Sequence, residues 1–310
     1  MESKVWIENY QKLNNSFNKT LVFRVGIESG FFSEINHMFM AVLYCLQHKI
    51  KFVLSSKNNN FSYQKGWEDY FLPFCEESYA DIHLKHNVRS HQGKVSVVNI
   101  IKLKLIRKSI GINYFTQDIW PYIKDTKFHN EIFNIPSLEI EGDFLNAMHI
   151  LAKHIWRYQP EIDKIIQQKL NSLSLPPSYV GVHIRSGDIE KKNYAISSYM
   201  ELVKSLSINK DVFVATDNYS SISQIQKQFN DYRIYTFCEK TETGFSEGAY
   251  NNQSKESKKE TLINLLTDTE GLYRSATFVG TLSSNVGVFV GMRRKAKSWY
   301  GIDANEWRIF

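Results

Sequence analysis

The stretch Tyr179-Val180-Gly181-Val182-His183-Ile184-Arg185-Ser186-Gly187-Asp188 decides the fold class of this chain. Its first half is an apolar strand, and its second half is a polar turn that contains a His, an Arg, a Gly and an Asp. A buried strand of an open α/β sheet delivers the residues at its carboxyl end to a ligand crevice. Arg185 suits a phosphate there, because a planar guanidinium binds two oxygens at once.

The segments that follow this strand alternate regularly between helix and strand. The pattern predicts helices over 197–206, 220–229, 258–274 and 286–292, and strands over 211–215, 232–235 and 276–280. Such a series is typical of half of a doubly wound nucleotide-binding domain. The segment Leu175-Pro176-Pro177-Ser178 is the best linker in the chain. We therefore expect an α/β fold with an acceptor-side α/β domain over 1–174 and a Rossmann-like domain over 178–310.

The N-terminal part begins with the same alternation. Residues 21–25 predict a strand, 35–48 a helix that Ser33 could cap, and 50–54 a second, parallel strand. The turn Gly26–Gly30 could receive an anion on its backbone N–H groups, although it lacks the GxGxxG and P-loop patterns. Further on, the aromatic-dense segment 66–74 is either an acceptor-side wall or a packed loop. A helix is expected over 142–173, broken by Pro160. The pattern does not organise residues 55–140.

The composition is that of an ordinary soluble globular protein, with 310 residues, 43% hydrophobic and 23% charged. The net charge of +6 suits an anionic ligand. Its positive charges look scattered, and no sustained basic stripe accompanies a nucleic-acid motif, so no nucleic-acid partner is expected. The basic surface is compatible with peripheral contact with an anionic membrane.

Cysteine usage and hydropathy bear on the compartment. The chain has three cysteines, Cys45, Cys75 and Cys238, without a CxxC pair or zinc-ligand spacing. A sparse, odd count favours a reducing compartment. No apolar run reaches the length of a membrane span, and the first residues do not resemble a signal peptide. We therefore expect a cytoplasmic protein without a transmembrane segment.

Three predicted strands of the second half end in polar residues. These ends are His183 to Asp188, Thr216-Asp217, and Thr281 to Asn285. In a parallel sheet they lie on one edge and can converge on one ligand. Taken singly, each strand end has an ordinary structural explanation. Arg185 could form a salt bridge, and Asp217 and Ser283-Ser284 could cap the helices that follow them. Together they favour a nucleotide site.

The third of these strand ends also opens a helix. Serine hydroxyls and helix N–H groups there would bind a phosphate. Asp268, near the end of the preceding helix, could pair with a guanine base or with a Lys.

Residues Gly181 to Arg293 resemble the fucosyltransferases that share an HxRxxD motif. The matching motifs are His183-Ile184-Arg185 with Asp188, then Asp211 to Asp217, then Phe278 to Asn285. The likeness is strongest to the α1,6-fucosyltransferases, which include the enzyme of N-glycan core fucosylation and the bacterial nodulation enzyme. Asp268 also falls at the spacing of a guanine-contacting Asp in those enzymes. The N-terminal half resembles them only loosely.

This resemblance implies a GT-B fold, in which two Rossmann-like domains face a cleft. It further implies GDP-fucose as the donor and inverting transfer without a metal or other cofactor. The donor-binding residues would be His183 in the nucleotide pocket, Arg185 at the β-phosphate, Asp217 at its strand end, Asp268 at guanine, and Ser283, Ser284 and Asn285 at the phosphates.

The chemistry of the reaction supports these roles. Breaking the sugar C1–O bond leaves negative charge on the diphosphate, so a cation there stabilises the transition state more than the ground state. No Asp-x-Asp at a strand end could hold Mg²⁺, which makes Arg185 the expected electrostatic catalyst. The acceptor hydroxyl needs a general base. Glu190, in the loop after the motif, is our choice, and Asp188 is expected to orient Arg185.

The chain departs from the α1,6 enzymes at two points. Ser186 stands where they carry a second Arg, and the loop to Tyr199 is shorter. These departures leave open the acceptor (an oligosaccharide or glycolipid) and the linkage. The predicted function is inverting, metal-independent transfer of fucose from GDP-fucose to a glycan hydroxyl. The alternatives are a transferase for another GDP-sugar and a non-catalytic nucleotide- or glycan-binding protein.

Overall fold

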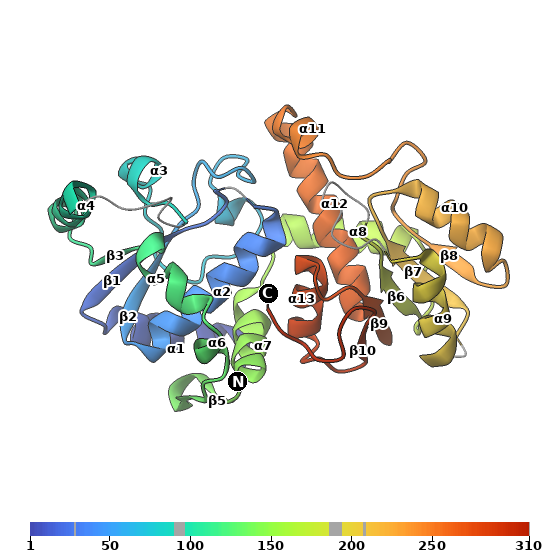
Figure 1. Cartoon of the computed structure of the whole chain (residues 1–310), viewed down its shortest axis with the longest axis horizontal. Helices are drawn as coiled ribbons and strands as arrows, with labels where there is room; N and C mark the ends of the chain where they lie inside the picture. The colour runs from blue at the N-terminus through green and yellow to red at the C-terminus, as the bar shows by residue number, and fades with distance from the viewer. Residues whose placement is uncertain (28, 90–96, 186–193, 207–208, 310) are drawn as a thin grey trace. The chain divides into compact units, whose positions relative to one another are not determined.

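The computed structural model describes residues 1–27, 29–89, 97–185, 194–206 and 209–309. The chain forms two compact units, Met1–Gln159 and Pro160–Phe310 (Figure 1). The division falls before helix α8 (Pro160–Ser172), whereas the sequence places a domain boundary at 175–178. Helix α8 belongs with the second unit because it packs against α12 (Lys255–Arg274). Assignment of acceptor-side and donor roles to the units stays a prediction.

The first unit has a parallel sheet of order β2-β1-β3 and a small antiparallel sheet of β4 and β5. Its elements are α1 (Ser3–Asn15), β1 (Lys19–Arg24), α2 (Phe31–Gln47), β2 (Ile50–Ser55), η1 (Trp67–Asp69), α3 (Ile82–His86), α4 (Val97–Ser109), β3 (Tyr114–Phe115), α5 (Thr116–Ile123), α6 (Thr126–His129), β4 (Phe133–Ile135), η2 (Pro136–Leu138), β5 (Ile140–Gly142) and α7 (Phe144–Ile155).

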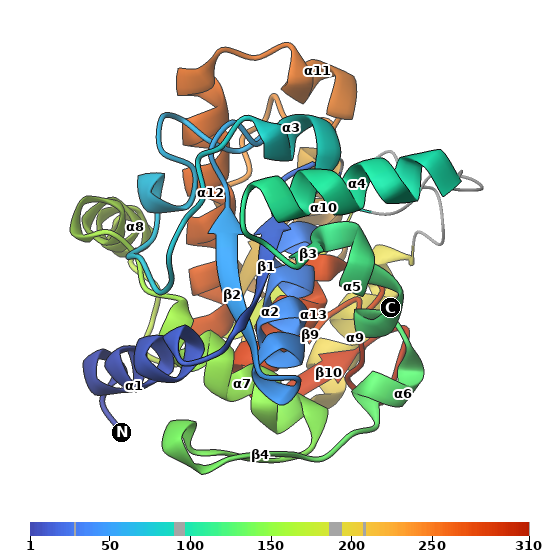
Figure 2. The ribbon, with the colours of Figure 1, turned by 90° about the vertical axis from the view of Figure 1, so that its left-hand side faces the viewer.

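The expected strand–helix–strand opening is confirmed. Strands β1 and β2 pair in parallel, with Leu21 opposite Phe52, and Figure 2 shows them side by side. Helix α2 connects them and is apolar nearly all round, so it lies inside the unit rather than on its surface. Its N-cap is Gly30, not Ser33, because the helix begins at Phe31. The segment expected as a helix over 142–173 forms α7 and α8, and Pro160 begins the second, where its missing N–H costs nothing.

The second unit has one five-stranded, fully parallel sheet of order β10-β9-β6-β7-β8. Besides α8 and α12, its elements are β6 (Val180–His183), α9 (Ile196–Leu206), β7 (Asp211–Ala215), α10 (Tyr219–Gln228), β8 (Arg233–Tyr235), α11 (Glu247–Asn251), β9 (Thr277–Gly280), α13 (Asn285–Arg293) and β10 (Trp299–Gly301).

Side chains of this sheet alternate between two covered faces. Val182 and Val214 pack with the apolar sides of α9 and α10 in one core cluster. On the opposite face, a Cβ at Gly181 would collide with Ser275, and one at Gly271 with the ring of Phe213, so α12 lies directly on the strands. A parallel sheet buried on both faces is the predicted doubly wound half-domain.

Two further observations concern the compartment. Across the described ranges, no helix combines the length and the apolarity that crossing a bilayer requires. Cys45, Cys75 and Cys238 are free thiols, the first and last of them buried.

Candidate functional site

The candidate site lies at the carboxyl edge of the second sheet, where the chain reverses its strand order. From β6 the chain moves outward to β7 and β8, and it then returns through α12 to β9 on the other side of β6. The amide of Ile184 donates to the carbonyl of Ala215 over 3.0 Å, and Val182 pairs with Val279 of β9. The three polar strand ends therefore share one edge, as expected. Crevices at such switch points are where open α/β sheets bind ligands.

His183 and Arg185 leave β6 at this edge. His183 is buried, and burial together with the nearby Arg185 guanidinium lowers its pKa to about 4, so the imidazole is neutral at pH 7. Its Nδ1 has no hydrogen-bond partner among the described residues. Arg185 is half-buried and makes no ion pair within the described part of the chain. No described carboxylate neutralises this guanidinium, and its charge suits an anionic ligand.

Asp217, at the end of β7, holds a loop. Its Oδ2 accepts a hydrogen bond from the amide of Phe245 at 2.8 Å, and its carbonyl accepts one from Gly244 at 2.8 Å. Helix α10 is capped instead by Asn218, whose side chain accepts from the amide of Ser220. The alternative in which Asp217 caps this helix is therefore wrong. Asp217 positions the 244–245 segment at the edge of the sheet.

Asp268 lies in the second half of α12 and has a strongly perturbed carboxyl. Burial raises its pKa to about 8, and the charges of Glu242 and Asp217 act in the same direction, while Lys169 of α8 opposes them. Its Oδ1 is enclosed and has no hydrogen-bond partner within the described ranges. A buried polar atom of this kind indicates a missing partner. Helix α12 begins three residues before the expected 258, at Lys255, with Ser254 as its N-cap.

The turn after β9 is held by a residue from further along the chain, Asp303, which the sequence did not reveal. The amides of Leu282 and Ser283 donate to Asp303 Oδ1 and Oδ2 over 2.7 and 2.9 Å. Burial works against the Asp303 carboxylate, but hydrogen bonds from Ser283 and Leu282 hold its pKa below the usual value. Asp303 follows β10, which the sequence did not predict either. No local pattern identifies such a long-range partner.

Ser284 is the buried N-cap of α13 and makes no capping hydrogen bond with its side chain to any described residue. The first bond between successive turns of α13 runs from the Val288 amide to the Ser284 carbonyl at 3.0 Å. The amides of residues 285–287 therefore precede the helical ladder and point toward its N-terminal end. Gly287 allows Thr281 to approach closely, because a Cβ there would collide with the Thr281 carbonyl.

Of the predicted site residues, the structure brings those that follow β6, β7 and β9 to one edge of the sheet, and Asp268 lies within electrostatic reach of Asp217. Ser283 is exposed, whereas Ser284 is buried and Asn285 begins α13. Asp188 and Glu190 lie outside the described residues. Nowhere in the described ranges do three or more His, Cys, Asp or Glu side chains gather as metal ligands.

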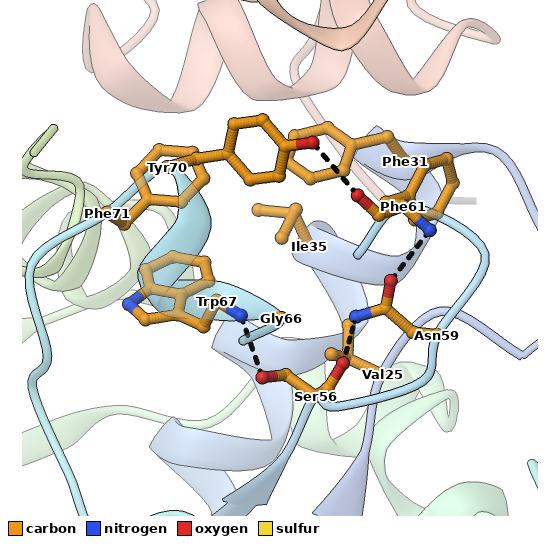
Figure 3. Close-up of a pocket in the computed structure, with 10 residues that line it drawn as sticks. All are labelled: Val25, Phe31, Ile35, Ser56, Asn59, Phe61, Gly66, Trp67, Tyr70 and Phe71. Atoms are coloured by element: carbon orange, nitrogen blue, oxygen red, sulfur yellow. Dashed lines mark hydrogen bonds between the residues drawn. The ribbon is translucent and has the colours of Figure 1, made fainter. Parts of the chain in front are cut away.

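The first unit has a small cavity of its own, of about 20 Å³, beyond the ends of β1 and β2. Figure 3 shows Phe31, Trp67 and Tyr70 around it, with Asn59 at one side. A cavity of this size holds about one water molecule, not a sugar. Trp67 stacks on Phe71 with ring centroids 4.3 Å apart, and both are buried. Segment 66–74 is therefore packed as a loop, and its ring faces are not exposed as an acceptor wall.

The turn Gly26–Gly30 already holds an anion from the protein itself. Glu34 of α2 accepts from the amides of Gly26 at 3.0 Å and Ser29 at 3.2 Å, and it also pairs with Arg89. The carboxylate of Glu34 thus occupies the backbone donors that the sequence had suggested for a ligand.

These features define a doubly wound α/β unit of the nucleotide-binding class, with its candidate site at a topological switch point. Residues 7–289 match the family of alpha-(1,6)-fucosyltransferase N- and catalytic domains. The chain belongs to this family and is a glycosyltransferase. A search of curated protein sequences finds no match.

Solved structures of fucosyltransferases share the fold. The chain is similar to the fucosyltransferase NodZ from Bradyrhizobium, with a TM-score of 0.54, 17% identity, and coverage of 90% of this chain and 93% of NodZ. NodZ alpha-1,6-fucosyltransferase soaked with GDP-fucose gives a TM-score of 0.56 at 14% identity, covering 89% and 92%. A variant of Arabidopsis thaliana FUT1 in complex with GDP gives 0.51 at 13%, covering 94% and 73%. The predicted GT-B fold class is thereby confirmed.

Proposed function

We propose that this protein transfers fucose from GDP-fucose to the hydroxyl of an oligosaccharide or glycolipid, with inversion and without a metal. The observation that supports the proposal is that the strand ends before Arg185, Asp217 and α13 share one edge of one sheet, and that the charge of Asp217 acts on the Asp268 carboxyl. The similar NodZ structure was soaked with GDP-fucose, and another was crystallised with GDP. These relatives support the donor, and the site supplies groups that suit each part of it.

In this mechanism each part of the donor meets a group of opposite character. The diphosphate lies between the guanidinium of Arg185 and the first-turn amides of α13, whose dipole favours negative charge. The guanine N–H groups donate to the carboxylate of Asp268, which gives the enclosed Oδ1 its partner. His183, neutral and buried, lines the pocket without adding charge. Asp217 keeps the 244–245 loop in place at this edge.

The chemical step is a single displacement at C1 of fucose. The acceptor oxygen forms the new bond on one face while the C1–O bond to GDP breaks on the other, so the configuration inverts. Negative charge develops on the β-phosphate, where Arg185 stabilises it in place of a metal ion. The acceptor proton passes to a carboxylate, for which we propose Glu190, with Asp188 orienting Arg185. The cytoplasmic location is likewise part of this proposal.

The test is substitution of Arg185 in the full chain. Arg185→Ala should lower kcat for fucose transfer by at least about a hundredfold, near 3 kcal/mol, because the site loses charge stabilisation of the leaving group. Turnover is measured as GDP released from GDP-fucose in the presence of a panel of oligosaccharide acceptors. Activity in EDTA should equal activity without it.

Arg233→Ala is the matched control. Arg233 is the first residue of β8 and lies at the amino edge of the same sheet, away from the candidate site, where it pairs with Asp211. Its loss should leave turnover close to that of the parent. A folded Arg185→Ala protein with normal turnover would refute the mechanism, and loss of activity in EDTA would refute metal independence.

Assays of the parent protein also distinguish two other functions from fucose transfer. Faster transfer from GDP-mannose than from GDP-fucose would assign another GDP-sugar. Binding of GDP without transfer or donor hydrolysis, with every acceptor tried, would assign a binding protein.

A further inference from the structure

Helix α4 leaves large apolar side chains in solvent. The side chains of Val98, Ile101 and Leu105 are 73%, 54% and 63% exposed. Their spacing of three and then four residues places them on one stripe of the helix. An exposed stripe of this kind marks an interaction site rather than an ordinary surface.

The stripe is bordered by positive charge. Lys102, Lys104 and Lys108 are exposed, and none forms an ion pair with a described residue. Between Asp81 and Asp118 the sequence has seven Lys and Arg and no Asp or Glu. Because the whole chain carries +6, the remainder is almost neutral. The net positive charge of the chain therefore comes mainly from the segment that contains α4, although Arg89 and Arg107 are paired with Glu34 and Asp118.

The opposite side of α4 holds it to the first unit. Arg107 pairs with Asp118 of α5, and its guanidinium lies 5.9 Å from the ring centroid of Phe115. Nine residues separate Arg107 from Val98, which is two and a half helical turns, so the two project to opposite sides. Leu103 and Ile106 are half-buried. Both views show α4 at the edge of its unit (Figures 1 and 2).

We propose that α4 is an interfacial helix that docks this protein on an anionic lipid surface. Val98, Ile101 and Leu105 would enter the boundary between headgroups and acyl chains, and the flanking lysines would contact lipid phosphates. Such a surface matches both features of the helix, because its apolar interior receives the stripe and its negative headgroups attract the lysines. The proposal does not depend on the donor or on fucose transfer.

Other occupants match the helix less well. A nucleic acid would satisfy the lysines but leave the apolar stripe in water. A second copy of this chain joined through α4 about a two-fold axis would bring lysines against lysines, because the same patch is used on both sides. Lipid is the occupant that pairs with both features.

The test is co-sedimentation of the full chain with vesicles. The protein should bind vesicles of phosphatidylcholine mixed with phosphatidylglycerol and not those of phosphatidylcholine alone. Replacing Lys102, Lys104 and Lys108 together by Gln should weaken binding on the order of a hundredfold, since each basic residue near the surface contributes about fivefold. Ile101→Asp should weaken it by about tenfold or more.

Ile132→Asp is the matched control, because Ile132 is 70% exposed in the same unit but lies outside α4. It should bind vesicles like the parent. The altered side chains are exposed, so all variants should keep the parent's melting temperature and GDP affinity. These two measurements distinguish loss of membrane binding from unfolding or from failure of the proposed donor site.

Three outcomes overturn the proposal. The first is absence of binding to anionic vesicles, and the second is equal loss of binding in Ile101→Asp and Ile132→Asp. The third is binding of duplex DNA, or a concentration-dependent dimer that Ile101→Asp abolishes, in a protein that does not sediment with vesicles.

Discussion

Asp268→Asn should make the protein more stable and a weaker GDP binder. In the folded chain, burial keeps the Asp268 carboxyl protonated up to a pKa of about 8, against an ordinary value of 3.8. Unfolding at pH 7 lets the carboxyl lose its proton, and this ionisation favours the unfolded state by about 4 kcal/mol. Asn has no proton to lose, so the variant is not destabilised in this way. For a unit of this size, the melting temperature should rise on the order of 10 °C.

The pH dependence identifies the cause. Below about pH 4 the carboxyl is protonated in both states, and the variant gains nothing. Between pH 4 and pH 8 the unfolded state alone loses the proton, so the parent loses stability relative to Asp268→Asn as the pH rises. Above pH 8 both states are ionised and the difference is constant. Urea unfolding at pH 4, 6 and 9 measures this, with Asp163→Asn as the control, because Asp163 is an exposed carboxylate of α8 in the same unit.

The affinity for GDP should fall in Asp268→Asn, whereas its stability rises. Guanine N–H groups donate to a carboxylate more strongly than to an amide oxygen, so Asp268→Asn should lose about 2 kcal/mol of GDP affinity. The parent should also release a proton when GDP binds at pH 7, because the carboxyl must ionise to accept both donors. Titration calorimetry in buffers of different ionisation enthalpy measures that proton. A stability gain that is independent of pH, or unchanged GDP affinity, would refute the reasoning.

Two more substitutions test the packing of the units. Glu34→Gln should cost about 3 kcal/mol, because the half-buried guanidinium of Arg89 loses its buried charge partner; urea unfolding measures it, and a loss below about 1 kcal/mol would contradict this coupling. Gly271→Ala should cost about 1–3 kcal/mol, since the added methyl meets the Phe213 ring in a close-packed layer; an unchanged melting temperature would mean that α12 can move away from the sheet.

The second unit was the easier one to predict from the sequence. Strands of a parallel sheet are buried on both faces, so β6 and β7 stand out as apolar runs, and their helices follow at regular spacing. Strand β10 has three residues and no such run, which explains why it was missed. Helix α1 carried a signal that could have been used, because Trp6, Ile7 and Tyr10 are buried at helical spacing.

The candidate site was predictable as a place more than as a set of contacts. Sheet topology alone brings the ends of β6, β7 and β9 to one edge, so those residues could be grouped before any coordinates. The partners could not be found this way. Asp217 could cap a helix or hold a loop with equal plausibility, and the choice depends on where the 244–245 segment runs. The enclosure of Asp268 likewise results from packing against α8, which is distant in sequence.

The two turn–helix junctions that looked alike in sequence differ in what already occupies them. At the first, Glu34 accepts from the Gly26 and Ser29 amides and carries its own cation, so the anion site is filled by the fold. At the second, Asp303 takes only the amides of Leu282 and Ser283, ahead of α13. That carboxylate fixes the turn ahead of the helix, so the positive end of the α13 dipole lies at the edge of the sheet where β6 and β9 end. A helix terminus whose backbone donors are already bound by an internal carboxylate has little left for a ligand, which removes the first junction and leaves the second as the proposed phosphate site.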